Sequence, residues 1–503
     1  MFIKVGVREP SFGWAGTIIA VMMLAVLIGL NFYYSEEETT GPDVRESEEL
    51  SAEEHTILVL WYAESMLEFR DGYLVADPTW RWLTGYMKDW QLEDEILTAF
   101  SKEGYGLTRQ DALRWMITLV DMGRRAEAKE IHLGVMRGQA VEEEVLTVSS
   151  WIMEVPSGER MGNTGPSQER EIPQAVLNFI NKKGQGGRAQ SGPDWWQRKV
   201  AEWVENAGGE SGLQAYESHQ DIAHIKKAKG EKLYEQAIFN SLLAIGSSIF
   251  FLLMGLFYWG KSVERSGWFY AKYLGEWSMW AVWNGLLRIT VLMMGGGILV
   301  YTLTYALPGY KSGLFTIVGG TLLILLCLMV LVRWYFPHRT VFYHEAGMTF
   351  AHLFQRKLFW WVGVGILLDY LLLGYLMVWL QPLLGGGSVE DIISPELLRG
   401  ERMDFISEMW QCCILAPVFE EVLFRGILFS ALRRRVPVLF AAVLSSLVFA
   451  GLHFYSLSGF VSVFLGGCIF AWIYHKTESL WAAILIHAIT NALIVIGIWG
   501  LFA

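Results

Sequence analysis

Two adjacent carboxylates and an arginine interrupt an apolar stretch towards the end of the sequence. Residues 416–425 read A-P-V-F-E-E-V-L-F-R, and their neighbours from 409 to 432 are mostly apolar. A charged residue at the centre of a membrane helix raises the free energy of insertion by about 2.5–3.5 kcal/mol. Three charges in six residues therefore indicate a functional site. Glu421 and Arg425 are four residues apart and can neutralise each other on one helix face. Glu420 lies about 100° away and has no such partner, so we assign chemistry to Glu420 and architecture to the other two.

Two later apolar segments carry polar residues at the same four-residue spacing. The first pairs Phe449 with His453, and the second pairs His487 with Asn491. A histidine inside a helix is more often a satisfied structural residue than a catalyst, so each pattern alone is weak. Hydrolytic chemistry with an activated water needs a base that deprotonates the water and donors that stabilise an oxyanion. Glu420 with a histidine suits the first task, and the imidazole and amide on the last helix suit the second.

The three motifs E-E-x-x-x-R, F-x-x-x-H and H-x-x-x-N, in this order, resemble those of the CPBP family of intramembrane endopeptidases, which includes the CAAX prenyl endopeptidases. The resemblance covers residues 392–503. It implies a glutamic-type peptide hydrolase in which a glutamate and a histidine activate water, while a second histidine and an asparagine stabilise the tetrahedral intermediate. The matching positions here are Glu420, His453, His487 and Asn491, with structural support from Glu421, Arg425 and Phe449.

Two alternatives stay open beside this hypothesis. Glu420, His453 and His487 could instead hold a zinc ion with a vacant coordination position. We favour a mechanism without a cofactor, because asparagine is a poor zinc ligand and Arg425 neutralises Glu421. A non-catalytic membrane scaffold or an immunity-type protein could also use the same polar residues only to hold its helices together.

The composition is that of a membrane protein with a large water-exposed part. Of 503 residues, 53% are hydrophobic and 14% aromatic, including 23 tryptophans. The net charge of −11 argues against a nucleic-acid partner. The high hydrophobic fraction predicts that membrane lipid surrounds the apolar segments. All four cysteines lie in apolar segments, which predicts no disulfide framework.

Hydropathy predicts a polytopic all-α bundle of about nine membrane spans. An N-terminal signal anchor occupies residues 1–35, accessory spans occupy 236–390, and the catalytic core occupies 391–503. The predicted spans are 14–30, 237–259, 279–307, 314–334, 359–380, 405–432, 438–455, 460–474 and 479–501. Basic residues in alternate short loops predict a cytoplasmic N-terminus. Residues 36–235 contain no Asn-x-Ser or Asn-x-Thr sequon, which is compatible with a bacterial inner or cell membrane.

Residues 36–235 are polar and predict a mainly helical extracytoplasmic domain inserted after the first span. The helical patterns at 108–122 and 124–136, joined at Gly123, predict a helical hairpin. The Gly-rich segment 157–193 is expected to be mobile. This domain could bind a protein partner or present a peptide or protein substrate to the membrane core.

Two further charges, Arg288 and Asp369, fall inside predicted spans. They lie at similar distances from the cytoplasmic ends of their spans. They could form an ion pair between helices, or Arg288 could extend towards the membrane surface instead.

Overall fold

The structure is a computed structural model. It describes residues 17–18, 20–23, 52–75, 88–102, 109–136, 143–154, 172–181, 195–207, 220–257, 278–306, 313–335, 346–381, 383–384 and 402–502. Within these ranges every regular element is a helix and no strand occurs, which confirms the predicted all-α class there. Most of the predicted anchor lies outside the described residues. Of the segment 157–193, only residues 172–181 are described, and they contain a short helix.

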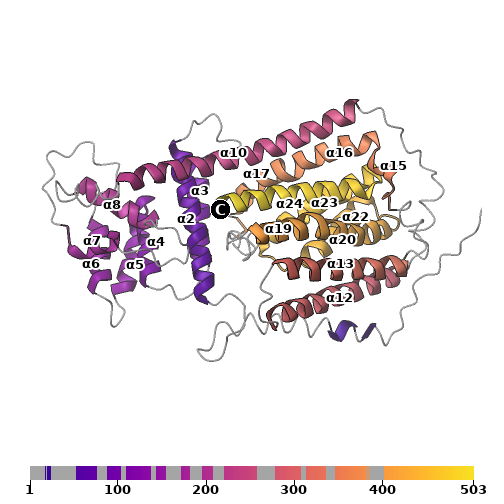
Figure 1. The fold of residues 1–503 in the computed structure, drawn as a ribbon, viewed down its shortest axis with the longest axis horizontal. Helices are drawn as coiled ribbons and strands as arrows, with labels where there is room; N and C mark the ends of the chain where they lie inside the picture. Colours follow the sequence, from indigo (N-terminus) through magenta and orange to yellow (C-terminus); the bar gives the residue numbers. More distant parts are fainter. Residues whose placement is uncertain are drawn as a thin grey trace, which may run out of the picture. The chain divides into compact units, whose positions relative to one another are not determined.

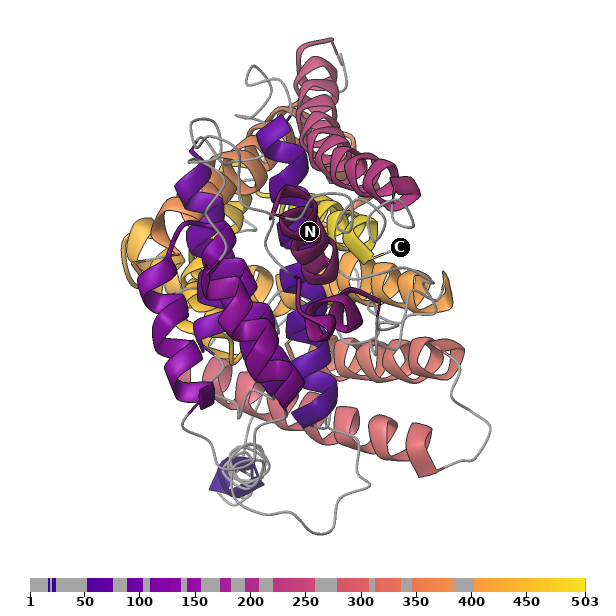
Figure 2. The ribbon, with the colours of Figure 1, turned by 90° about the vertical axis from the view of Figure 1, so that its left-hand side faces the viewer.

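The chain divides into two compact units, residues 48–236 and residues 237–503 with 1–47, which we describe separately (Figures 1 and 2). Besides the beginning of α10, the described helices of unit 48–236 are α2 (Ala52–Val75), α3 (Asp89–Lys102), α4 (Arg109–Asp121), α5 (Arg125–Met136), α6 (Glu143–Glu154), α7 (Gln174–Asn181) and α8 (Trp195–Ala207).

Helices α4 and α5 form the hairpin that the sequence predicts, with its turn at Gly123. The Arg124 N–H donates to the Leu119 carbonyl at 2.8 Å, and the Gly123 N–H donates to the Val120 carbonyl at 3.1 Å. Gly123 has a φ of 76°, a conformation that costs glycine little because it has no Cβ. The glycine therefore ends α4 and lets the chain reverse.

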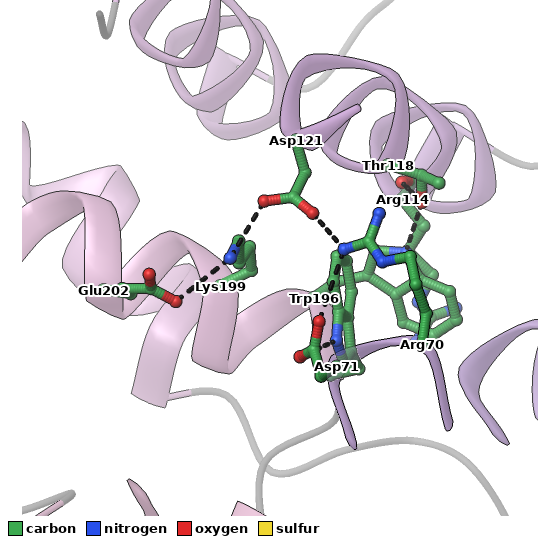
Figure 3. A network of polar contacts seen from close by, with 9 residues as sticks. Arg70, Asp71, Arg114, Thr118, Asp121, Trp196, Lys199 and Glu202 are labelled. Carbon is green, nitrogen blue, oxygen red and sulfur yellow. Dashed lines mark hydrogen bonds and ion pairs between the residues drawn. The ribbon is translucent and has the colours of Figure 1, made fainter. Parts of the chain in front are cut away.

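A network of charged and aromatic side chains joins α2, α4 and α8 (Figure 3). Asp121 on α4 is paired with Arg70 on α2, and the Nζ of Lys199 on α8 lies 2.9 Å from its Oδ1. The Trp196 indole N–H donates to the Thr118 hydroxyl at 3.0 Å. Three helices that lie far apart in the sequence are thereby joined in the interior of this unit.

The ionisation of this network is set by its buried ion pairs. Burial alone raises the pKa of the Asp121 carboxyl, but the nearby Arg70 and Lys199 cations outweigh burial and hold that pKa below its ordinary value. Burial lowers the pKa of Lys199, and its carboxylate neighbours outweigh this and raise it. Opposite shifts in acid and base are those of a mutually satisfied pair, so we assign the network to architecture.

In unit 237–503, where η marks a π-helix, the described helices are the rest of α10 (Gln220–Phe257), α12 (Met279–Ala306), α13 (Gly313–Tyr335), α15 (Phe350–Leu353), α16 (Arg356–Ile366), η3 (Leu367–Leu373), α17 (Gly374–Leu380), α19 (Arg402–Trp410), η5 (Gln411–Leu415), α20 (Ala416–Glu421), η6 (Val422–Phe429), α21 (Ser430–Leu432), α22 (Val438–Gly451), α23 (Leu457–Thr477) and α24 (Leu480–Phe502). Helices α22, α23 and α24 are neighbours, and α16 packs on the last two (Figure 1).

Six described helices are long and apolar enough to cross a membrane, so the protein is a multi-pass integral membrane protein. They are Lys232–Phe257, Met279–Val300, Ile317–Trp334, Arg356–Leu380, Leu457–Thr477 and Leu480–Gly500. Each coincides with one of the nine predicted spans. Three predicted spans are not among these six. The span 405–432 lies in a helical stretch from 402 to 432 that carries the three site charges, and the span 438–455 corresponds to α22, which has 14 residues. The predicted anchor span 14–30 lies mostly outside the described residues.

The core of this unit lies where α16, the stretch 402–432, α23 and α24 meet. Completely buried side chains there include Val362, Ile427, Phe429, Ile473 and Ile486. Close packing of these helices from several sides gives the polar residues among them fixed positions.

Candidate functional site

Residues 402–432 form a helix without a break, which we call the Glu420 helix. It comprises α19, η5, α20, η6 and α21 in succession. Two of these five segments are π-helical, with i→i+5 hydrogen bonding that is rare and often found at functional sites. The π-turns change the direction in which successive side chains point, so a regular helical wheel does not describe this helix.

The Glu421–Arg425 pair forms as the four-residue spacing predicts. Arg425 Nη1 lies 2.9 Å from Glu421 Oε1, and the side chains are 1% and 0% exposed. The guanidinium also donates from Nη2 to the Gly467 carbonyl of α23 at 3.1 Å. Its carbon lies 4.4 Å from the Phe449 ring centroid and 5.3 Å from that of Phe470. Arg425 is thus held by a carboxylate, a backbone carbonyl and two aromatic faces.

Gly467 makes this arrangement sterically feasible. A Cβ at that position would lie 3.0 Å from Ser446 of α22 and 3.1 Å from Arg425 Nη2. Both distances are tighter than ordinary van der Waals contacts, so α22 and α23 approach closely beside the guanidinium. A larger residue would have to displace the arginine or separate the helices.

His487 on α24 joins both carboxylates of the Glu420 helix. Its Nδ1 lies 3.0 Å from Glu421 Oε1 and donates to that carboxylate, and its Nε2 lies 3.8 Å from Glu420 Oε2. The imidazole stacks on Phe470 with ring centroids 5.1 Å apart and meets Phe449 edge-on at 6.1 Å. Glu421 therefore fixes the ring orientation that turns Nε2 towards Glu420.

His453 follows the end of α22, next to the same aromatic group. Its Nδ1 lies 2.8 Å from the Phe449 carbonyl, and the two rings are 4.8 Å apart in an edge-to-face contact. A carbonyl can only accept, so Nδ1 carries the proton and Nε2 is left as the acceptor in the neutral ring. The next residue, Phe454, has a φ of 55°, which is unusual for a bulky side chain.

Asn491 lies one turn beyond His487 on α24. Its Nδ2 donates to the Cys412 carbonyl of the Glu420 helix at 2.7 Å. Within the described residues, Glu420 makes no hydrogen bond or ion pair with His453 or Asn491. The structure thus joins His487 directly to Glu420, while Phe449 is the aromatic contact shared by His453, His487 and Arg425.

Asp369 is a residue of this region that the sequence reasoning did not assign to it. It lies on η3, contacts the Thr490 side chain of α24, and has Arg425, His487 and Glu421 as its charged neighbours. The contact with Arg288 considered from the sequence is therefore wrong, because the partners of Asp369 come from α24 and the Glu420 helix. A charged residue inside a span indicated that Asp369 has a role. It lies in the π-helix η3, however, and helical periodicity in the sequence does not predict a π-turn or the side that Asp369 faces.

The alternative zinc ligands do not converge. Among the described residues, no three His, Cys, Asp or Glu side chains are grouped as metal ligands. Glu420 Oε2 and His487 Nε2 are 3.8 Å apart, and Nδ1 of His487 lies 3.0 Å from Glu421 Oε1. A zinc site on Glu420, His453 and His487 stays an alternative prediction.

Comparisons with known proteins concern the same C-terminal region. The family model described as "Type II CAAX prenyl endopeptidase Rce1-like" matches residues 403–493, which contain all three motifs. The "Putative membrane peptidase YdiL" of Bacillus subtilis (strain 168) is 34% identical over 83 residues, which are 16% of this chain and 34% of that protein. The chain thus spans about a third of the length of this relative. No solved structure gives a significant match.

Proposed function

Residues 403–493 are a domain of the CPBP/CAAX prenyl endopeptidase family, and from this premise we propose that the protein is an intramembrane endopeptidase that uses a glutamate-activated water. One observation supports the choice of glutamate most directly. The Glu420 side chain is 22% exposed and faces His487, whereas Glu421 is 0% exposed and engaged with Arg425. Of the two glutamates, Glu420 is the one with a partly exposed carboxylate that is not engaged with Arg425.

The proposed roles follow from which atoms are already engaged. Glu420 is the general base that removes a proton from water. The Nε2 of His453 accepts a hydrogen bond from that water and orients it. His487 donates from Nδ1 to Glu421, so its Nε2 can donate to a developing oxyanion only when the ring carries both protons. Asn491 uses one amide hydrogen on the Cys412 carbonyl and retains a second for the same oxyanion. No metal or other cofactor takes part in this proposal.

A membrane scaffold is the second candidate, and two observations favour it. The Glu421–Arg425 pair and the Asn491–Cys412 hydrogen bond both join neighbouring segments, as a purely architectural cluster would require. A scaffold has no need of a partly exposed carboxylate beside an imidazole, however, because that arrangement costs stability in a membrane. Glu420 is therefore the residue that distinguishes the two functions.

The remaining parts of the proposal concern topology and substrate. The basic short loops favour a cytoplasmic N-terminus with residues 36–235 on the opposite side, and we place the protein in a bacterial inner or cell membrane. We assign to that domain the recruitment of a membrane-associated protein substrate or of a protein partner. The hydrolysed bond lies in a peptide that enters between the helices of the core.

The test compares membranes that contain the wild-type protein with membranes that contain Glu420→Gln. We expect quantitative proteomics to find a protein that accumulates uncleaved in the variant, and purified wild type, but not the variant, to cleave it in detergent. Equal cleavage by both purified proteins would contradict the role of Glu420. If no membrane protein or peptide library member differs between the two, the scaffold is the better description.

A further inference from the structure

The Glu420 helix has a gap in its backbone hydrogen bonding between Cys412 and Pro417, on the N-terminal side of Glu420. In η5 the Ala416 N–H donates to the Gln411 carbonyl, five residues back. This N–H is the one that would bond the Cys412 carbonyl in an α-helix. The next donor in the π pattern would be residue 417, which is a proline and has no N–H. The Cys412 carbonyl therefore lacks a partner in its own helix.

The Asn491 amide occupies this gap from α24, since its Nδ2 lies 2.7 Å from the Cys412 carbonyl oxygen. In a membrane, a backbone group that has lost its helical partner must be satisfied by a neighbouring helix, because lipid offers no hydrogen bond. One turn earlier on α24, His487 contacts Glu421 and Glu420 at 3.0 and 3.8 Å. Helix α24 thus contacts the Glu420 helix on both sides of Pro417.

We propose that Asn491 is a positioning residue: its amide fills the gap created by Pro417 and fixes the Glu420 helix against α24, so that Glu420 faces His487. The contact itself follows from the geometry alone, and its effect on catalysis rests on the proposed function. The amide has two hydrogens, so this contact leaves one for an oxyanion. A regular α-helix at this point would need no such contact.

A double-mutant cycle on the full-length protein in detergent tests the contact. Pro417→Ala supplies a backbone N–H that can bond the Cys412 carbonyl without help. We expect Asn491→Ala to lower Tm by about 2–4 °C in the Pro417 background and by less than half as much in the Pro417→Ala background. Equal losses of Tm in the two backgrounds would overturn the proposal.

Thr490→Ala is the matched control. Thr490 is the neighbouring residue on α24, is buried, donates to carbonyls of its own helix and contacts Asp369. Pro417→Ala should leave the effect of Thr490→Ala unchanged, because these two sites share no hydrogen bond. If Asn491→Ala does not accumulate as folded protein, recovery of folded protein in Pro417→Ala/Asn491→Ala supports the proposal, and failure of both variants to accumulate overturns it.

Catalytic rates test the positioning role separately. At a temperature well below every Tm, kcat of Asn491→Ala should be low, and it should recover in part in the double variant while KM changes little. Recovery of Tm without any recovery of kcat would show that the contact only stabilises and would overturn the positioning role. If wild type itself cleaves no peptide, the proposed function fails, but the coupling in Tm still decides whether Asn491 fills the Pro417 gap.

Discussion

Glu420 and Glu421 are consecutive residues, yet His487 contacts both with different nitrogens. Its Nδ1 is 3.0 Å from the fully buried Glu421, and its Nε2 is 3.8 Å from the partly exposed Glu420. The Glu421 carboxylate orients the imidazole, and the Glu420 carboxylate lies beside it and is partly exposed. Both carboxylates are required in this proposal: Glu421 to orient His487, and Glu420 to act on water.

Glu420→Gln should therefore abolish peptide cleavage while the protein still folds. The amide nearly preserves the shape of the side chain but cannot remove a proton from water. The measurement is turnover of a cleaved substrate by purified protein, with a melting curve from the same preparation. Turnover at the wild-type rate would refute this role, and a large fall in Tm would show that Glu420 supports the fold as well.

Removing one member of the Glu421–Arg425 pair should destabilise the protein strongly. Glu421→Leu or Arg425→Leu leaves a buried charge without compensation, at a cost of about 3–5 kcal/mol. The double variant removes both charges and should melt closer to wild type than either single variant. It should still be a poor enzyme, because His487 Nδ1 loses its acceptor. Single variants that melt like wild type would contradict the architectural role.

Gly466→Ala should disturb the site through Asp369. A Cβ at Gly466 would lie 2.9 Å from Asp369 Oδ1, so the carboxylate or α23 must shift. We expect a loss of about 1–3 kcal/mol in stability together with reduced turnover. Gly374→Ala is the control, because nothing lies within 4 Å of a Cβ there. Equal effects of the two substitutions on the melting curve would argue against a role for the space beside Asp369.

Activity should survive chelation of divalent metals. In the proposed mechanism, Glu420 deprotonates water directly and no step needs a metal-bound hydroxide. The measurement is turnover before and after dialysis against EDTA, followed by addition of zinc or magnesium. Loss of activity that zinc alone restores would replace this mechanism with the zinc alternative.

The ion-pair network of unit 48–236 should make stability depend on acid pH. The folded pKa of Asp121 is depressed, so its contribution is fully present above the unfolded pKa of about 3.9 and is lost as pH falls through the folded value. The difference in Tm between wild type and Asp121→Asn should therefore be constant near neutral pH and shrink below about pH 4. Tryptophan fluorescence can follow this unfolding, because Trp195 and Trp196 lie beside the network.

A control distinguishes a buried pair from a surface one. Glu127 pairs with Arg124 at 2.7 Å, but its side chain is 50% exposed. Glu127→Gln should change Tm little at any pH, since exposed pairs contribute about 0–1 kcal/mol. If Asp121→Asn behaves in the same way, the network does not contribute the stability that its burial indicates.

Contacts within one helix were predictable from the sequence, and so was the helical class. The i,i+4 spacing was sufficient to predict the Glu421–Arg425 bond and the close contact between Phe449 and His453. The turn at Gly123 followed from the need for a positive φ at the end of a helix. These features depend only on local geometry, which residue type and period determine.

The partners that meet between helices were only partly predictable, because they depend on helix rotation: Glu420 was expected beside a histidine, and the structure shows that it is His487. Distance from a span end suggested a link between Asp369 and Arg288, whereas η3 turns Asp369 towards Thr490 and the site. Asn491 was expected at an oxyanion, and the structure shows one hydrogen of its amide on a backbone carbonyl that Pro417 leaves unpaired. A proline seen in a sequence does not reveal which neighbouring side chain compensates for it.

The π-turn at Gln411–Leu415 also affects how this helix should be aligned with its relatives. A π-turn holds one more residue than the α-helical turn it replaces, so deleting one residue there would keep the helix continuous. Because the removed residue is the extra one of the π-turn, α19 would keep nearly the same rotation relative to Glu420, whereas a deletion within a regular α-helix would rotate it by about 100°. A homologue without this turn would therefore align with this chain only across a one-residue gap inside the Glu420 helix.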